Sequence, residues 1–237
     1  MREVFTFLPS SPFFSLLPYS FLKGMNTVVF DLDGTLLDTL TDLSNAVNHA
    51  LREHGLPERT TAEVRSFLGN GIRFLMEHAV GEHLGECDFE QVFASFRAYY
   101  VAHCLDFTAP YPGIMPLLAE LKARGVRMAI VSNKLHPAVQ SLNQRFFADY
   151  VTSAVGESAT VRRKPCPDAV MAALRELGSS TSEAIYVGDS EVDLETSQRA
   201  GLPCALCLWG FRDEDFLRKL PGASLFLRQP SDLLSLV

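Results

Sequence analysis

The segment Asp31-Leu-Asp-Gly-Thr-Leu-Leu-Asp-Thr39 directly follows an apolar run, Asn26-Thr-Val-Val-Phe30. A short uninterrupted run of this kind is typical of a buried strand, so Asp31 and Asp33 stand at the exit of that strand. Carboxylates next to a core are costly unless they are paired, hydrogen-bonded or bound to a metal. The two acids therefore predict a functional site at the end of the first strand. A solvated Asp-Gly turn is the alternative interpretation of the same residues.

The composition limits the class of protein. With 237 residues, 47% of them apolar, the chain can form one large α/β domain or a core with a smaller second domain. Its net charge of −7 argues against a nucleic-acid-binding surface, which normally shows a basic face. The five cysteines fit no disulfide framework, and the Cys204-x-x-Cys207 spacing lies in an apolar run typical of a buried strand. We therefore expect a reduced, cytoplasmic setting.

Residues 1–24 differ from the rest of the chain. The apolar stretch 5–22 is interrupted by three prolines and would make a poor transmembrane helix. It also lacks a strongly basic start and a small-residue cleavage site, so a signal peptide is not expected, and neither is a membrane partner. We predict a poorly ordered N-terminal extension, with Met25 as an alternative start of the functional protein.

The pattern of expected helices and strands changes near residue 109. Before that point, helical patterns follow one another without a strand, at 41–54, 61–68, 72–80 and 88–104. Thr60-Thr-Ala-Glu63 is typical of a capping box at the start of the second. After that point, helices alternate with apolar strands, expected at 126–131, 150–153, 184–187 and 204–208.

Such alternation indicates a parallel sheet with helices on both faces. We therefore predict a Rossmann-like α/β core from residues 25–38 and 109–237. An all-helical module, residues 39–108, is inserted just after the first strand.

Polar residues follow several of the expected strands or stand in the loops between them. Because ligands of open α/β sheets bind at the carboxyl ends of the strands, we expect these residues to share one site. Taken singly, each has an ordinary explanation, such as a helix cap, a first-turn acid or a surface lysine. Their joint occurrence in this order points to a site. They are Asp31, Asp33, Ser132, Asn133, Lys164, Asp189 and Asp193.

These residue types are suited to phosphoryl transfer. A carboxylate such as Asp31 can attack a phosphoryl group and form an aspartyl phosphate. Asp33, two residues further along the same face, can protonate the leaving oxygen and then activate water. Gly34 and Thr35 keep the turn tight, so that their backbone N–H groups can point at a phosphate.

The remaining residues can hold the phosphate and a cation. Ser132 and Asn133 can donate hydrogen bonds to phosphoryl oxygens, and Lys164 can neutralise both the nucleophile and the transferring group. Several carboxylates facing a phosphate need a metal ion. Asp31, Asp189 and a backbone carbonyl near Asp33 supply the oxygen ligands that Mg²⁺ prefers.

The whole set resembles the four motifs of the haloacid dehalogenase superfamily of phosphatases. The resemblance rests on the segments Asp31–Thr39, Ser132-Asn133, Lys164-Pro165 and Gly188-Asp-Ser-Glu-Val-Asp193. The position of the insert resembles the subfamily with a small helical cap. Gly69-Asn-Gly71 and Leu208-Trp-Gly-Phe211 are similar to phosphoglycolate phosphatases. The resemblance covers about residues 26–228.

The resemblance implies a role for each matching residue. Asp31 would be the nucleophile, Asp33 the general acid and base, and Ser132 and Lys164 the phosphate-holding groups. Asp189 would complete a Mg²⁺ site, and Asp193 would support the metal site or Lys164 without binding the ion itself. The cap would close over the core to exclude water, with Asn70 and Arg73 as the candidates for reading the substrate.

We therefore predict a Mg²⁺-dependent phosphatase acting on a small phosphorylated metabolite, with 2-phosphoglycolate as the favoured substrate, in a monomer or homodimer. A phosphosugar mutase, an inorganic pyrophosphatase and a phosphonate hydrolase remain alternatives in the same superfamily. A receiver-type signalling module also uses a phosphorylated aspartate, but it carries no helical insert. A non-catalytic relative would be expected to lose Asp31 or Asp33, and both are present.

Overall fold

A computed structural model describes residues 24–237. Nearly all of the predicted N-terminal extension, residues 1–23, lies outside the described part. Within residues 24–237, no helix is both long and apolar enough to span a bilayer.

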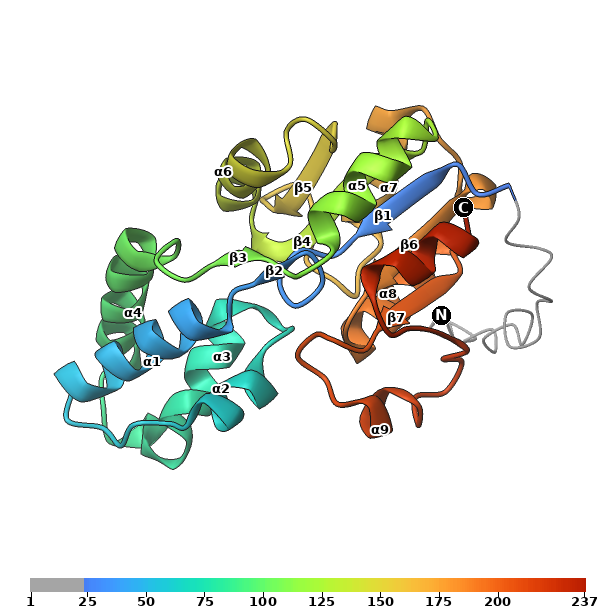
Figure 1. Cartoon of the computed structure of the whole chain (residues 1–237). Helices are drawn as coiled ribbons and strands as arrows, with labels where there is room; N and C mark the ends of the chain where they lie inside the picture. The colour runs from blue at the N-terminus through green and yellow to red at the C-terminus, as the bar shows by residue number, and fades with distance from the viewer. Residues whose placement is uncertain (1–23) are drawn as a thin grey trace, which may run out of the picture.

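The centre of the molecule is a six-stranded sheet in which every pairing is parallel, in the order β5-β4-β1-β6-β7-β8 (Figure 1). Its strands are β1 (Thr27–Phe30), β4 (Arg127–Leu135), β5 (Ser153–Glu157), β6 (Ala184–Gly188), β7 (Cys204–Cys207) and β8 (Leu225–Leu227). The predicted parallel sheet is confirmed, but the strand expected at 150–153 was placed too early. Residues up to Val151 still belong to a helix-ending turn, in which the Val151 N–H donates to Phe147 O at 2.8 Å.

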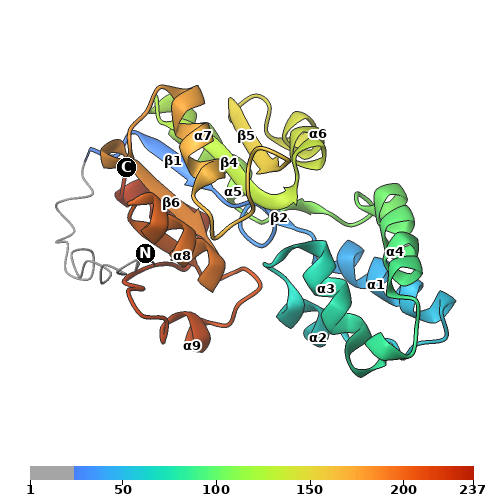
Figure 2. The same ribbon diagram turned by 180° about the vertical axis from the view of Figure 1, so that it is seen from behind.

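Helices cover both faces of this sheet, as Figures 1 and 2 show from opposite sides. Alternate residues of β1 enter different cores: Val28 and Phe30 pack on one face, and Val29 packs on the other. All three are buried, which accounts for the continuous apolar run in the sequence. The first face carries α5 (Ile114–Ala123), α6 (His136–Phe146) and the 3₁₀ helix η5 (Pro230–Ser235). The second carries α7 (Asp168–Leu177), α8 (Glu191–Ala200) and α9 (Glu214–Leu217), and η4 (Thr181–Glu183) precedes β6.

The inserted helices form a separate group beside the sheet (Figures 1 and 2). They are α1 (Leu40–Glu53), α2 (Thr61–Phe67), α3 (Gly71–Val80), the 3₁₀ helix η3 (Gly81–Gly85) and α4 (Phe89–His103). This group has its own apolar cluster, in which Leu51, Met76 and Phe96 are fully buried. The predicted capping box is confirmed: the Thr60 side chain accepts from the Glu63 N–H, and the Glu63 carboxylate accepts from the Thr60 N–H.

Two short strands join the helical group to the sheet. β2 (Leu37–Asp38) leaves the core and β3 (Ala109–Pro110) returns to it, and the two pair antiparallel. Buried Asp42, on α1, accepts hydrogen bonds from the N–H groups of Phe107 (3.0 Å) and Thr108 (2.9 Å). The beginning and the end of the insert are therefore tied together next to the strand pair.

A bulge shapes the end of β4. Val131 pairs with Val155, and the next pair is Leu135 with Glu157. The three residues 132–134 therefore lie opposite the single residue 156. Bulges bend a strand and redirect its side chains, and this one directs three consecutive polar residues toward the carboxyl edge of the sheet.

Candidate active site

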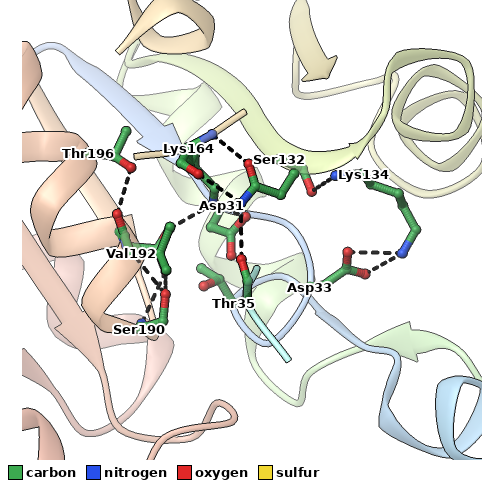
Figure 3. A network of polar contacts seen from close by, with 12 residues as sticks. Asp31, Asp33, Thr35, Ser132, Lys134, Lys164, Ser190, Val192 and Thr196 are labelled. Carbon is green, nitrogen blue, oxygen red and sulfur yellow. Dashed lines mark hydrogen bonds and ion pairs between the residues drawn. The ribbon is translucent and has the colours of Figure 1, made fainter. Parts of the chain in front are cut away.

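Four segments that are far apart in the sequence meet at the carboxyl edge of the sheet. Asp31 follows β1, Ser132 lies in the bulge of β4, and Asp189 follows β6. Lys164 comes from the loop between β5 and α7, and its Nζ lies 2.7 Å from Asp31 Oδ1. Figure 3 shows Lys164 and Ser132 close to Asp31. The expected convergence of these residues at one sheet edge is therefore present.

Three of the acids form a compact buried cluster. Carboxylate oxygens of Asp31, Asp189 and Asp193 lie within 4.8 Å of one another, and all three residues are buried. Lys164 contacts two of them: its Nζ lies 2.7 Å from an oxygen of Asp31 and 2.7 Å from an oxygen of Asp193. Three carboxylates beside one ammonium leave an excess of negative charge in a desolvated place.

The electrostatics of this cluster favour a bound cation. Burial, followed by the charge of Asp193, raises the pKa of Asp31 well above its ordinary value. The same two causes raise the pKa of Asp189 to about 7. A divalent ion would remove this penalty, and an all-oxygen donor set is what Mg²⁺ prefers. The residues therefore fit a magnesium site.

Asp193 has little capacity left for a metal. Its Oδ1 accepts from Lys164 Nζ (2.7 Å) and from the Tyr186 hydroxyl (2.9 Å). Its Oδ2 accepts from the N–H groups of Asp189 and Ser190, each at 3.1 Å, and from the Ser190 hydroxyl at 2.6 Å. Burial acts to raise the pKa of Asp193, but the charge of Lys164 and these hydrogen bonds bring that pKa below its usual value. Asp193 therefore positions Lys164 and caps α8, which leaves the other two acids to hold an ion.

Asp189 is held by a close-fitting frame of backbone. Its Oδ2 accepts from the Phe211 N–H at 2.6 Å, and its Oδ1 lies 3.4 Å from the Thr35 hydroxyl. Gly34 has φ +88°, and a Cβ there would lie 2.8 Å from Asp189 Cγ. A Cβ on Gly210 would lie 2.5 Å from the carbonyl oxygen of Gly34. Both positions require glycine, because any side chain would displace Asp189.

The turn after Asp31 corrects one prediction. The Gly34 N–H donates to Leu37 O at 2.9 Å and the Thr35 N–H donates to Leu32 O at 3.4 Å, so neither N–H is free for a phosphate. The tight turn consumes these donors itself. The N–H groups of Leu32 and Asp33 have no partner within residues 24–237, and they are the free donors directly after Asp31.

Asp33 lies apart from the acid cluster. Both of its carboxylate oxygens accept from Lys134 Nζ, at 2.8 and 2.9 Å, and Figure 3 shows its side chain directed toward Lys134. For a metal, Asp33 therefore offers its backbone carbonyl. The ring of Tyr100, on α4, lies over Lys134 with its centroid 5.4 Å from Nζ. Burial acts to lower the pKa of Lys134, but the charges of Asp33 and Tyr100 raise it above its ordinary value.

Lys134 was missed in the sequence, although it directly follows Ser132 and Asn133. A lone lysine is normally a surface residue. Its position in the bulge, which only the strand pairing shows, turns it inward.

The bulge residues Ser132 and Asn133 differ in what they can still donate. Ser132 is buried and its Oγ accepts from the Lys134 N–H at 3.2 Å, so its hydroxyl hydrogen is free to donate. The amide of Asn133 donates to Gly69 O (3.0 Å) and to Lys164 O (3.2 Å), and its Oδ1 accepts from the Lys164 N–H (2.6 Å). Asn133 therefore has no hydrogen left for a phosphate. It positions Lys164 and ties the core to the 69–71 turn of the insert.

Of the two residues expected to read the substrate, only one lies at the seam between insert and core. The Asn70 carbonyl accepts from Arg163 Nη1 at 3.2 Å. Arg73 instead pairs with Glu90 and with Glu77 (3.3 Å), all within the inserted helices. The structure therefore does not bring Arg73 to the site, because neighbouring acids on its own helical group hold it.

A second seam between insert and core lies at the loop after β7, which includes the segment Leu208-Trp-Gly-Phe211. Arg212 donates to Leu68 O of the insert at 2.7 Å and pairs with Glu191 of the core at 2.8 Å. Arg65, on α2, donates to Gly210 O at 3.1 Å. The buried side chain of Phe211 belongs to the apolar cluster of the inserted helices. The insert thus rests on the loop that also frames Asp189.

Comparisons with known proteins agree with this arrangement. Residues 28–207 match the model of the haloacid dehalogenase-like hydrolase family. The chain is 35% identical to a phosphoglycolate phosphatase of Aquifex aeolicus, over 90% of this chain and 97% of that one. It is 36% identical to phosphoglycolate phosphatase 1 of Pseudomonas aeruginosa, over 82% and 73% of the two chains.

A crystal structure from Lactobacillus delbrueckii subsp. bulgaricus, of a protein provisionally described as a phosphoglycolate phosphatase, superposes with a TM-score of 0.83. The two chains are 31% identical, and the match covers 89% of this chain and 97% of that one.

Proposed function

Because the chain belongs to the haloacid dehalogenase-like hydrolase family, we propose that it is a Mg²⁺-dependent phosphatase. Its substrate is a small phosphorylated metabolite, 2-phosphoglycolate, which it hydrolyses through an aspartyl phosphate on Asp31. One observation carries the proposal. Asp31 Oδ1 is bound by Lys164 Nζ at 2.7 Å, while its Oδ2 accepts no hydrogen bond within residues 24–237 and is free to attack.

In the first step, Asp31 Oδ2 forms a bond to phosphorus as the bond to the leaving oxygen breaks. The Leu32 and Asp33 N–H groups and the Ser132 hydroxyl are available to hold the phosphoryl oxygens. Lys164 offsets the charge shared by the nucleophile and the transferring group. Asp31, Asp189 and the backbone carbonyl of Asp33 would hold Mg²⁺, which when bound would supply positive charge that lets a phosphate approach these carboxylates.

Asp33 carries the protons. It gives one to the leaving oxygen in the first step and takes one from the attacking water in the second. In the second step a bond forms between the water oxygen and phosphorus as the bond between Asp31 Oδ2 and phosphorus breaks, which releases phosphate and restores the Asp31 carboxylate. Asp31 must attack as an ionised carboxylate, whereas Asp33 must give up a proton and later take one. The site therefore needs two separate carboxylates in different surroundings.

The helical insert, residues 39–108, acts in this proposal as a cap, and residues 25–38 and 109–237 act as the core. Its two connections to the core, β2 and β3, lie side by side and are suited to a hinge. Closure of the cap keeps bulk water from the phosphoryl group, and opening releases the product.

The choice of 2-phosphoglycolate is supported by the names of the relatives from Aquifex aeolicus and Pseudomonas aeruginosa. A reduced, cytoplasmic setting is supported by the free state of all five cysteines. We propose that the small metabolite is the main partner and that the protein works as a monomer or homodimer, which sedimentation velocity will distinguish.

Turnover of p-nitrophenyl phosphate with and without Mg²⁺ tests the proposal, alongside an Asp31→Asn variant and a panel of phosphometabolites. We expect Mg²⁺-dependent turnover, highest kcat/KM for 2-phosphoglycolate, and loss of turnover in the variant. A variant as active as the parent would show that Asp31 is not the nucleophile. A higher kcat/KM for a phosphosugar or for pyrophosphate would be consistent with the proposed mechanism but would show that 2-phosphoglycolate is not the preferred substrate.

A further inference from the structure

Lys134 is a buried cation at the place where the cap meets the core. Its side chain is 9% exposed, and its only ion pair within residues 24–237 is with Asp33, whose oxygens lie 2.8 and 2.9 Å from Nζ. The ring of Tyr100, on the cap helix α4, lies with its centroid 5.4 Å from the same Nζ. Nζ contacts both oxygens of Asp33 and also hydrogen-bonds the Tyr100 side chain. An ammonium has three N–H donors, so a negatively charged group would be bound here by sharing or replacing the Tyr100 contact, beside the ion pair with Asp33.

We propose that Lys134 binds the carboxylate of the substrate and so makes the site specific for small phosphorylated carboxylic acids. This inference rests on the proposed function and goes beyond it, because it assigns the specificity to one side chain. Nothing in the reaction at phosphorus requires a cation at this position.

The geometry follows from the role of Asp33. A general acid must lie within hydrogen-bond reach, about 2.6–3.2 Å, of the leaving oxygen that it protonates. In 2-phosphoglycolate the carboxylate carbon is two bonds from that oxygen. Since Lys134 Nζ lies 2.8 Å from Asp33 Oδ1, a carboxylate attached this close to the leaving oxygen comes within reach of the ammonium.

The charge balance points the same way. The substrate carboxylate must enter beside Asp33 and near the buried acid cluster, in a protein of net charge −7. A cation between the two carboxylates offsets their repulsion, and the interaction is strengthened where water is excluded. The burial of Lys134 beneath Tyr100 provides such surroundings.

Two other cations at the seam are already engaged with acids. Arg65 pairs with Asp213 at 2.9 Å, and Arg212 pairs with Glu191 at 2.8 Å. Arg163 has no acidic partner within residues 24–237, but it is exposed and contacts the Asn70 carbonyl. Arg163 is therefore the competing candidate, and the experiment includes it.

The test compares 2-phosphoglycolate with 2-hydroxyethyl phosphate, which has the same length and a neutral end. We expect the parent to prefer the carboxylate by about 100-fold in kcat/KM, the range of a charge-assisted hydrogen bond. Lys134→Met should reduce this preference to within about threefold, and Lys134→Arg, which keeps a cation, should retain part of it. Lys219→Met removes an exposed lysine and is the matched control, which should behave as the parent.

The preference, not the rate, decides between the possible roles. If Lys134 only positions Asp33, both substrates will fall by the same factor in Lys134→Met, and the proposal is wrong. It is also wrong if the parent shows no preference, or if Arg163→Gln removes the preference while Lys134→Met keeps it. Failure of the proposed function would look different, as absence of Mg²⁺-dependent phosphatase activity on either substrate.

A measurement on the parent alone covers the case in which Lys134→Met does not fold. Moving the carboxylate one methylene away, in 3-phosphonooxypropanoate, should lower kcat/KM at least about 10-fold because the ammonium is held rigidly by its ion pair. Equal values for the two acids would contradict the assignment.

Discussion

The backbone N–H of Phe211 donates a 2.6 Å hydrogen bond to Oδ2 of Asp189, and the side chain of the same residue is buried among the cap helices. One residue therefore touches both the candidate metal ligand and the core of the cap. The position of the cap and the geometry of the metal site are coupled through it. The loop after β7 therefore contributes both to the docking of the cap and to the position of Asp189 in the core.

Truncation of Phe211 tests the packing half of this coupling. Phe211→Ala removes a buried ring but keeps the N–H that binds Asp189, so we expect weaker cap docking and little change in Mg²⁺ affinity. Phe→Ala changes in a core cost about 3–5 kcal/mol, here divided between stability and docking. Hydrogen exchange of α2 and α3 should increase and kcat/KM should fall at least about 10-fold. Phe216→Ala, at a ring that is 45% exposed, is the control and should change neither.

Gly210 tests the other half, the frame around Asp189. Gly210→Ala places a Cβ 2.5 Å from the carbonyl oxygen of Gly34, so backbone or carboxylate must move. We expect a loss of about 1–3 kcal/mol in the free energy of unfolding and weaker Mg²⁺ binding by titration calorimetry. Gly85→Ala, where a Cβ meets no atom within 4 Å, is the matched control. Unchanged Mg²⁺ affinity in Gly210→Ala would show that the frame does not determine the metal site.

The meeting of Asp31, Lys164 and Asp189 could be predicted from the sequence because parallel strands bring their carboxyl ends to one edge. The order of the four motifs along the chain then indicated the role of each residue. Helix boundaries in the insert were also close, since caps and 3.6-residue periodicity are local signals. The strand at Ser153–Glu157 was placed too early because its sequence, Ser-Ala-Val-Gly-Glu, has little of the β-branched character that marks strands.

The missed residues depend on non-local geometry. Lys134 faces inward because β4 bulges against β5, and no pattern along the chain specifies a bulge. Arg73 lies on a cap helix with the expected periodicity, but its partners Glu77 and Glu90 decide where its charge goes. The role of Phe211 depends on how cap and core dock. The partners of side chains across the seam between cap and core are determined by tertiary packing. Neither the composition of the sequence nor the spacing of its motifs specifies that packing.

Lys164 should carry much of the stability of the acid cluster. Lys164→Met removes the ammonium that pairs with Asp31 and Asp193, and breaking a buried pair typically costs about 3–5 kcal/mol. Urea unfolding without metal at pH 8 should show this loss. The loss should shrink at pH 5.5, because the raised pKa of Asp31 and Asp189 lets them take up protons. Lys122→Met, at an exposed lysine, is the control; an equal loss at both pH values would contradict this account.

Mg²⁺ binding should depend on pH through Asp189. Burial and the charge of Asp193 raise its pKa from the ordinary 3.8 to about 7, so without metal the folded state binds this proton more tightly than the unfolded state. The penalty on stability is therefore greatest above pH 7 and falls as the pH decreases from about 7 toward 4. Mg²⁺ needs the ionised carboxylate, so a fixed Mg²⁺ concentration should raise Tm more at pH 8 than at pH 5.5. Asp189→Asn should lose this difference, and equal shifts in the parent would exclude Asp189 as a ligand.

In the proposed mechanism, Asp31 becomes phosphorylated during turnover. The most direct measurement is rapid quenching of the enzyme with Mg²⁺ and substrate, followed by borohydride reduction, which converts an aspartyl phosphate to homoserine, and peptide mass spectrometry. We expect homoserine at position 31, present only with substrate and absent in Asp31→Asn. Homoserine at another aspartate, or full turnover with position 31 unmodified at every quench time, would contradict it.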